Sequence, residues 1–124
     1  MVEEAPEGTP VFNQPAGHLE ANETLADAVI REVREETCRL FVPKGLIGIY
    51  QWVSPKGATY VRFCFHGEVG EALEYCRLDP DIRATHWLDE SQLKNGYPSI
   101  PLLWMFFLEI QPRLWEVLGP VHVN

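Results

Sequence analysis

The chain has 124 residues, of which 46% are hydrophobic and 23% are charged, and its formal net charge is −8. This length suits one domain with its own core, so we expect a single domain over residues 1–124. The acidic balance argues against a nucleic-acid polymer as partner but not against a small phosphorylated substrate, because metal ions supply positive charge locally.

The first predicted elements are a short strand over residues 10–14 and a helix that begins after Thr24. Thr24 is suited to be the N-cap, and Asp27 three residues later gives a capping-box-like pair at the positive end of the helix. Apolar side chains recur at helical spacing over residues 25–33, which predicts one buried face. An extended segment at residues 40–42 follows the helix.

A β-hairpin is predicted over residues 45–68. The segment at residues 54–57, Ser-Pro-Lys-Gly, is a strong turn signal between two extended arms. The second arm alternates apolar and polar side chains, so one face is core and the other can line a cleft. Four side chains are candidates for binding a heteroaromatic ring and its phosphates, although ordinary cross-strand packing explains each of them equally well: Tyr50, Trp52, Arg62 and His66.

The C-terminal part predicts a strand at residues 82–87, a short helix at residues 91–94 and a strongly apolar helix over residues 100–118, interrupted at Pro112. We expect the last helix to pack on the sheet and not to bind a partner. Its apolar run is far too short to span a membrane. Strands on both sides of an early helix, with a second helix late, indicate an α/β fold: an α/β/α sandwich around a mixed β-sheet.

The cysteines and the N-terminal residues indicate in which compartment of the cell the protein is found. Cys38, Cys64 and Cys76 are odd in number and lack Cys-x-x-Cys spacing, which favours reduced, structural thiols. Residues 1–8 are acidic and lack the apolar segment of a signal peptide. We therefore expect a cytoplasmic protein with no membrane partner, as a monomer or a homodimer.

Three glutamates, Glu32, Glu35 and Glu36, occupy neighbouring positions on the predicted helix because they follow at i, i+3 and i+4. Carboxylates this close repel one another, and each is harder to ionise without a counter-charge. A hard cation such as Mg²⁺ meets that need, since it binds carboxylates together with waters and substrate phosphates. For the triplet alone, a solvated acidic face supported by Arg31 and Arg34 is the commoner explanation.

The residues ahead of the triplet change that interpretation. Gly17 is followed after five residues by Glu23, and after seven more by the run Arg-Glu-Val-Arg-Glu-Glu at residues 31–36. This resembles the Nudix box, Gly-x5-Glu-x7-Arg-Glu-apolar-x-Glu-Glu-x-Gly-apolar, the signature of the Nudix hydrolases. Cys38 and Arg39 depart from it. Cys38 replaces the glycine that ends the helix in a left-handed conformation, which a cysteine adopts only at a cost of about 1 kcal/mol or more.

The resemblance implies a hydrolase that cleaves phosphoric anhydrides by water attack at phosphorus, with Mg²⁺, or Mn²⁺ in its place, as cofactor. It also implies roles for the motif residues. Glu32, Glu35 and Glu36 would hold the metal with the backbone carbonyl of Ala16. Gly17 would let the loop approach the metal, Arg31 would orient a glutamate, and Glu23 would steady the join between loop and helix.

The general base is either a glutamate of the box or an acidic residue from a later loop. Asp81 is the best later candidate for a role beside the metal, and Asp79, Glu71 and Glu74 are weaker ones. His18, next to the box glycine, is a candidate for contacting a phosphate, although a lone histidine is more often a structural hydrogen-bonding residue.

The longer run over residues 13–25 resembles the NudJ phosphatase branch of the family. This implies nucleoside tri- and diphosphates, or the pyrophosphate of the thiamin pyrimidine precursor, as substrates. Two alternatives are another Nudix specificity, such as oxidised nucleotides or a dinucleotide, and a catalytically silent domain that binds a nucleotide or a protein partner. Nudix domains usually carry a further strand ahead of the box. Only 16 residues precede Gly17, so we expect a short N-terminus that lacks this strand and leaves a strand position unpaired.

Overall fold

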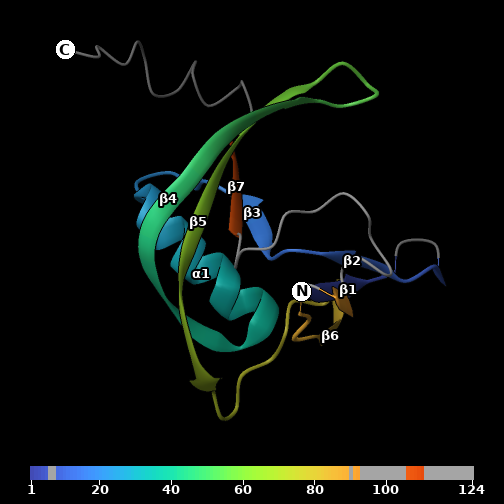
Figure 1. Ribbon diagram of the computed structural model, residues 1–124, viewed down its shortest axis with the longest axis vertical. Coiled ribbons are helices and arrows are strands. Elements are labelled where there is room, and N and C mark those ends of the chain that lie inside the picture. Colours follow the sequence, from blue (N-terminus) through green and yellow to red (C-terminus); the bar gives the residue numbers. More distant parts are fainter. Residues whose placement is uncertain (6–7, 90, 93–105, 111–124) are drawn as a thin grey trace.

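The computed structural model describes residues 1–5, 8–89, 91–92 and 106–110. Within them a helix, α1, lies between a long curved hairpin and a group of short strands (Figure 1). In chain order the elements are β1 (Val2–Glu4), β2 (Val11–Asn13), β3 (Ala16–His18), α1 (Leu25–Thr37), β4 (Arg39–Val53), β5 (Thr59–Ala72), β6 (Ile82–Thr85) and β7 (Phe106–Ile110).

The strands form two sheets. A three-stranded antiparallel sheet has the order β2-β1-β6, and a four-stranded sheet has the order β3-β7-β5-β4. The second sheet is mixed, because β3 pairs parallel to β7 while β5 pairs antiparallel to both β7 and β4. In Figure 1 α1 lies between the β4–β5 hairpin and the three-stranded sheet. The predicted mixed α/β fold is therefore confirmed.

The predicted start of α1 is confirmed. The hydroxyl of Thr24 accepts a hydrogen bond from the Asp27 N–H at 3.1 Å, and the Thr24 N–H donates to Asp27 Oδ2 at 3.3 Å. These two bonds satisfy backbone donors that the first turn of a helix otherwise leaves unpaired. Cys38 ends the helix in the left-handed conformation, with φ 52° and ψ 37°, and its N–H donates to the Arg34 carbonyl at 2.9 Å. The cysteine thus takes the backbone geometry of the family's glycine.

The core holds α1 against the hairpin. Val29 and Val33, each 1% exposed, pack with Phe41 of β4, and Phe65 and Val69 of β5 cover this cluster. Apolar burial of this kind contributes about 25 cal/mol per Å² removed from water. It fixes the rotation of the helix, so the acidic residues that border the apolar face are turned toward β3 and the loop before α1.

The predicted hairpin is present and longer than expected. In its turn the Gly57 N–H donates to the Ser54 carbonyl at 2.8 Å. The β4–β5 register shifts at three places, one of them between Pro43 and Gly45. Such bulges bend a strand and increase its twist, in keeping with the curvature in Figure 1. They also accommodate a proline, which lies here in an edge strand.

The helix predicted over residues 100–118 is wrong where it can be examined, because Phe106–Ile110 forms β7 between β3 and β5. A short apolar run cannot be assigned to a helix or a buried strand from periodicity alone. The remainder of that prediction, and residues 93–94 of the predicted short helix, lie outside the described residues. The second helical layer of the predicted sandwich also falls on residues outside the described ones.

The N-terminal residues form β1, which pairs with β2 on one side and with β6 on the other. The amino group of Met1 donates to the His86 carbonyl at 2.7 Å, which extends this pairing. The strand predicted at residues 82–87 is Ile82–Thr85. In the part of the chain that the structure describes, no helix has the length and apolar character needed to cross a membrane.

Candidate active site

Arg31 joins the loop before α1 to the helix. Its Nε and Nη2 donate to the two carboxylate oxygens of Glu23 at 3.1 and 2.7 Å, and Nη2 also donates to the His18 carbonyl at 2.9 Å. A bidentate pair of this kind is strong and directional. The Arg31 hydrogen bond lowers the pKa of Glu23, and Glu23 in turn raises the pKa of the guanidinium. The loop that carries the box glycine is therefore tied to the helix.

The same guanidinium reaches two members of the glutamate triplet. Its Nη1 donates to Glu32 Oε1 at 2.6 Å and to Glu35 Oε2 at 3.2 Å. The Glu32 side chain is 15% exposed, whereas that of Glu35 is 50% exposed. Arg31 thus orients one largely buried carboxylate and one accessible carboxylate on the same side of α1.

Glu36, the third member, binds the backbone of β3. The Ala16 N–H donates to Glu36 Oε2 at 3.0 Å. Burial raises the pKa of Glu36 to about 8; the Ala16 hydrogen bond opposes this, and the charges of Glu32, Glu4 and Asp79 add to it. Glu36 is therefore a desolvated acid among like charges, an environment that a bound cation would relieve.

Gly17 brings the loop backbone against the carboxylate of Glu32. A Cβ at Gly17 would overlap the carboxylate group of Glu32, so no larger residue fits while Glu32 keeps this position. Pairing with β7, in which Ala16 lies opposite Phe107, holds β3 in place. The fold therefore brings the Ala16–Gly17 backbone onto both Glu32 and Glu36.

The carboxylates beside the Ala16–Gly17 backbone are the kind of ligand that Mg²⁺ prefers. In the described ranges, no group of three or more His, Cys, Asp or Glu side chains is arranged to hold a metal ion. Mg²⁺ binds through one or two carboxylates and keeps waters and substrate phosphates as its other ligands. Two clustered carboxylates, one of them desolvated beside further negative charges, meet that requirement.

Of the candidates in later loops, Asp79 and not Asp81 lies toward the triplet. The Asp79 N–H donates to the Glu35 carbonyl at 2.9 Å, and its charge acts on Glu36. Asp81 is exposed, and its N–H donates to Asp79 Oδ1 at 3.1 Å. Glu4, in β1, also faces Glu36, and sequence reasoning missed it because no spacing rule links a short N-terminal strand to the helix.

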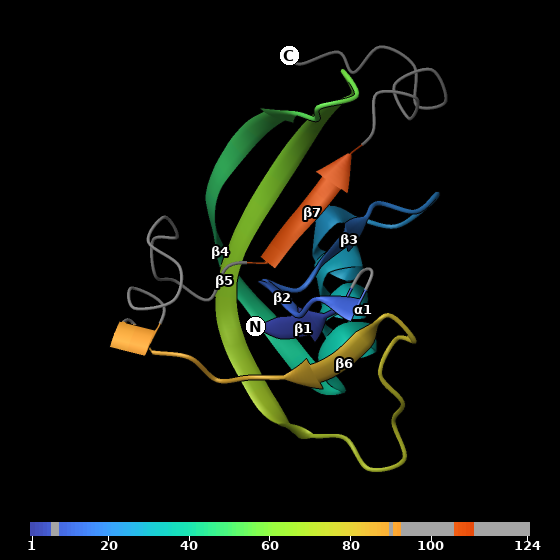
Figure 2. The same ribbon diagram turned by 90° about the vertical axis from the view of Figure 1, so that its right-hand side faces the viewer.

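Three of the four substrate-binding candidates of the hairpin lie near its turn. Tyr50 pairs opposite Arg62, whose guanidinium carbon lies 5.1 Å from the centre of the Trp52 ring. Trp52 is 44% exposed and also contacts Tyr60, with ring centroids 5.3 Å apart. The turn end of the hairpin projects beyond α1 in both views (Figures 1 and 2). The structure thus groups Tyr50, Trp52 and Arg62 with one another and not with the carboxylates.

His66 and His18 occupy two further places. His66 lies opposite Gly45, where its Nε2 would be 2.7 Å from an added Cβ. His18 lies at the end of β3 and is exposed, and its carbonyl is the one that binds Arg31.

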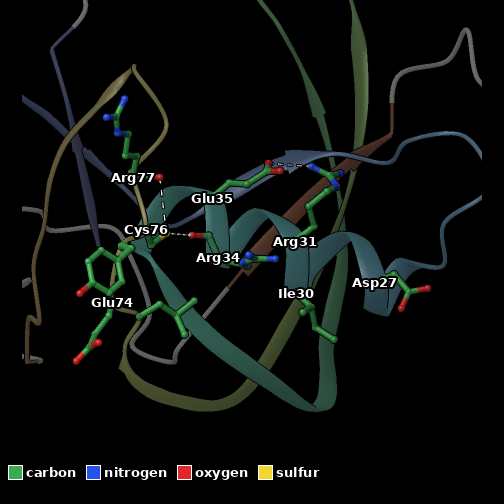
Figure 3. A pocket seen from close by; sticks show the side chains of 10 residues that line it. Asp27, Ile30, Arg31, Arg34, Glu35, Glu74, Cys76 and Arg77 are labelled. Atoms are coloured by element: carbon green, nitrogen blue, oxygen red, sulfur yellow. Dashed lines mark hydrogen bonds and ion pairs between the residues drawn. The ribbon is translucent and has the colours of Figure 1, made fainter.

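A groove of about 750 Å³ runs along the outer face of α1. Side chains of the helix, among them Ile30, Arg34 and Glu35, form one wall, and residues 73–77 form the other (Figure 3). The groove gives solvent and small molecules access to the accessible carboxylate of the triplet.

A disulfide closes one end of this groove and corrects the prediction of reduced thiols. Cys38 at the end of α1 is bonded to Cys76, with their Cα atoms 5.6 Å apart, which lies within the usual range for such a bond. Cys64 is buried and free, and burial raises the pKa of its thiol to about 11. The sequence lacked a signal for the pair because the two cysteines are separated by 38 positions and meet only when the chain folds.

Comparison with known proteins identifies the family. Residues 1–103 match the NUDIX domain family. Phosphatase NudJ of Shigella boydii serotype 4 (strain Sb227) is 38% identical over 104 residues, which are 83% of this chain and 68% of that protein. Phosphatase NudJ of Escherichia coli (strain K12) is 38% identical over 93 residues, which are 75% of this chain and 61% of that protein.

A solved structure, described as a NUDIX hydrolase from Nitrosomonas europaea, superposes with a TM-score of 0.72 at 41% identity, covering 78% of this chain and 67% of that one. The chain thus spans about two thirds of the length of the relatives it matches. With the box residues brought together by α1, β3 and the loop between them, this chain belongs to the Nudix family, as a hydrolase acting on phosphoric anhydrides.

Proposed function

We propose that the chain is a Mg²⁺-dependent pyrophosphohydrolase that acts on nucleoside tri- and diphosphates or on the pyrophosphate of a thiamin precursor. The observation that carries this proposal is the joint approach of the Ala16–Gly17 backbone to Glu32 and Glu36. The similarity to phosphatase NudJ supports a phosphorylated substrate. We further propose that residues 1–124 act as one domain in the cytoplasm, as a monomer or a homodimer.

In this proposal Glu32, Glu35 and Glu36 hold Mg²⁺, or Mn²⁺ in its place, with the Ala16 carbonyl as a further ligand. When bound, the metal neutralises phosphate charge and makes a coordinated water more acidic. The like charges around Glu36 support this assignment, because they favour a cation at that position. The exposure of Glu35 supports a position at the side open to substrate.

The other motif residues position these carboxylates. Arg31 donates hydrogen bonds to Glu32 and Glu35, and Glu23 accepts hydrogen bonds from Arg31. The helical turn with the three glutamates therefore keeps the same side-chain positions before substrate binds. The base that takes a proton from the attacking water is a glutamate of the triplet or a carboxylate from the loop after β5. Asp79 lies closer to the triplet than Asp81 by its contacts and is the better candidate from that loop.

Substrate would be bound by side chains outside the triplet. We propose His18 for a phosphate, because it adjoins the box glycine and lies at the exposed end of β3. Trp52, with Arg62 over its ring, offers a surface for stacking a base, with Tyr50 and His66 on the same hairpin. Since Tyr50, Trp52 and Arg62 lie near the turn, they would contact the part of the substrate farthest from the reacting phosphate.

The test is a panel of nucleoside tri- and diphosphates, the thiamin-precursor pyrophosphate, oxidised nucleotides and dinucleotides, with released phosphate measured with and without Mg²⁺. We expect phosphate release from nucleoside triphosphates, nucleoside diphosphates and the thiamin-precursor pyrophosphate in the presence of Mg²⁺, and none with excess chelator. Hydrolysis confined to oxidised nucleotides or dinucleotides would replace the substrate class. Thermal stabilisation by nucleotide without any phosphate release would indicate a binding domain and overturn the proposal.

A further inference from the structure

The segment at residues 73–79 is attached to the C-terminal end of α1 at three points. The Leu73 N–H donates to the Cys38 carbonyl at 2.8 Å, and the Asp79 N–H donates to the Glu35 carbonyl at 2.9 Å. Between them lies the disulfide from Cys38 to Cys76. The two hydrogen bonds join backbone groups at the ends of the segment, and the covalent bond fixes its middle.

The attached segment places charge beside the glutamate triplet. Its last residue, Asp79, binds the backbone of Glu35 and acts electrostatically on Glu36. A solvent-accessible backbone hydrogen bond contributes about 1 kcal/mol, so two of them hold a seven-residue segment only weakly. The disulfide is therefore the strongest of the three connections between this segment and α1; toward β6, the Ile82 N–H donates to the Asp79 carbonyl at 2.9 Å.

The disulfide is open to attack. Neither of its cysteines is fully buried. Cys76 lines the groove along α1, at the edge formed with Arg34 and Arg77 (Figure 3). A small dithiol, or the exposed dithiol of a reducing protein, has access to this bond from the groove.

We propose that the bond from Cys38 to Cys76 is a redox-sensitive latch: its reduction releases residues 73–79 from α1 and withdraws Asp79 from the glutamate triplet. The consequence for metal binding rests on the function proposed above. Disulfides in cytoplasmic proteins are commonly transient and regulatory, which fits a switch better than a permanent crosslink.

The chemistry is thiol–disulfide exchange with a dithiol as the reductant. One thiolate of the dithiol attacks a sulfur of the latch to form a mixed disulfide. The second thiolate of the dithiol then attacks the dithiol's own sulfur in that mixed disulfide and displaces the protein thiolate. The bond between the two protein cysteines breaks and two protein thiols form. The dithiol supplies both electrons and both protons and leaves as a cyclic or intramolecular disulfide.

The direction of the effect follows from the charge of Asp79. A carboxylate near Glu36 attracts a cation to the triplet, so its withdrawal weakens binding. With screening close to that of bulk water, removing one carboxylate about 8 Å from a divalent cation lowers its affinity by about 6-fold. Reduction should weaken Mg²⁺ binding by about that factor.

Cys38→Gly is the matched variant. Glycine adopts the left-handed conformation of position 38 without the cost that a side chain carries, so this change removes the disulfide and leaves the helix end intact. Cys64→Ser controls for the thiol outside the disulfide. Asp79→Asn keeps the latch and removes the charge.

The first experiment uses the metal-free protein and does not depend on activity. Amide hydrogen exchange of Leu73 and Asp79, whose N–H groups donate to carbonyls at the end of α1, is followed in the air-oxidised protein and after dithiothreitol. We expect exchange at least 10-fold faster after reduction in wild type and in Cys64→Ser, and fast exchange under both conditions in Cys38→Gly. Equal protection in oxidised and reduced wild type would overturn the latch. So would three free thiols in the denatured, air-oxidised protein.

The second experiment measures the Kd for Mg²⁺ calorimetrically in the same proteins. The oxidised wild type should bind more tightly than the reduced one, whereas Asp79→Asn and Cys38→Gly should not respond to dithiothreitol. An unchanged Kd in wild type would overturn the link between latch and triplet. Should hydrogen exchange respond to reduction while no substrate releases phosphate, the proposed function fails and the latch stands.

Discussion

The backbone N–H of Ala16 donates to Oε2 of Glu36 at 3.0 Å, and this hydrogen bond connects β3 to the last turn of α1. It fixes the position of the Glu36 carboxylate against the loop that precedes the Nudix helix. The arrangement explains why Glu36 keeps its position although burial and like charges disfavour its ionised form. Four predictions follow from the contacts around it.

Glu36→Gln should lower kcat by about 100-fold or more, because it removes a charged metal ligand and keeps the side-chain volume. Its amide can retain the Ala16 hydrogen bond, so the fold should persist. Steady-state phosphate release with saturating Mg²⁺ measures the effect. Glu68→Gln is the control, since Glu68 is 75% exposed and pairs with Lys44 on the hairpin. Equal activity of the two variants would show that Glu36 does not serve the reaction.

Mg²⁺ should stabilise the wild-type fold. A ligand that binds only the folded state at ten times its Kd adds about 1.4 kcal/mol to the free energy of unfolding, which raises Tm by several degrees. Differential scanning fluorimetry with increasing Mg²⁺, then with excess chelator, measures the shift and its reversal. Glu36→Gln should abolish most of the shift. A Tm that does not depend on Mg²⁺ in wild type would contradict the metal assignment.

Gly17→Ala should reduce activity more than stability. The new Cβ overlaps the Glu32 carboxylate, which must rotate away from Arg31 and from the site. We expect a fall of about 10-fold or more in kcat/KM, the size of effect that a misplaced catalytic group produces. Gly70→Ala is the matched control, because a Cβ there meets its nearest atoms, in Leu40, at 3.8 Å. Full activity in Gly17→Ala would mean that the position of Glu32 is not needed.

The pair of Glu23 with Arg31 should make stability depend on pH in the acid range. Because Arg31 lowers the pKa of folded Glu23 below its ordinary value of 4.5, the pair stabilises the fold above that value. The contribution is lost as the pH falls through the lower, folded pKa.

Glu23→Gln should therefore cost about 1 to 2 kcal/mol at neutral pH, and the cost should vanish in acid. Urea unfolding of wild type and variant at several pH values measures it. Glu20→Gln is the control, since Glu20 is 68% exposed and lies 3.8 Å from Arg31. A cost that persists unchanged in acid would contradict the ion pair as its source.

Much of α1 and the hairpin could be predicted because the relevant rules are local. Thr24 and Asp27 are three residues apart and cap the helix because the side chain of each accepts from the backbone N–H of the other, and the Gly57 N–H closes its turn on the Ser54 carbonyl. The order of Gly17, Glu23, Arg31 and the three glutamates identified the family for the same reason. These features depend on residues that lie close together in the sequence.

Other features required the folded chain. Phe106–Ile110 is a strand because it fills the position between β3 and β5, which no local pattern states. The approach of Asp79 and Glu4 to Glu36, and the bond between Cys38 and Cys76, join positions far apart in sequence.

The sequence by itself thus determined the family, the helix with its cap and the candidate ligands, because these depend on short spacings. Only the tertiary structure decided which distant carboxylates face Glu36, which cysteines pair and where the hairpin aromatics lie. Such contacts depend on how strands pair and how α1 packs, and neither can be read from short spacings in the sequence.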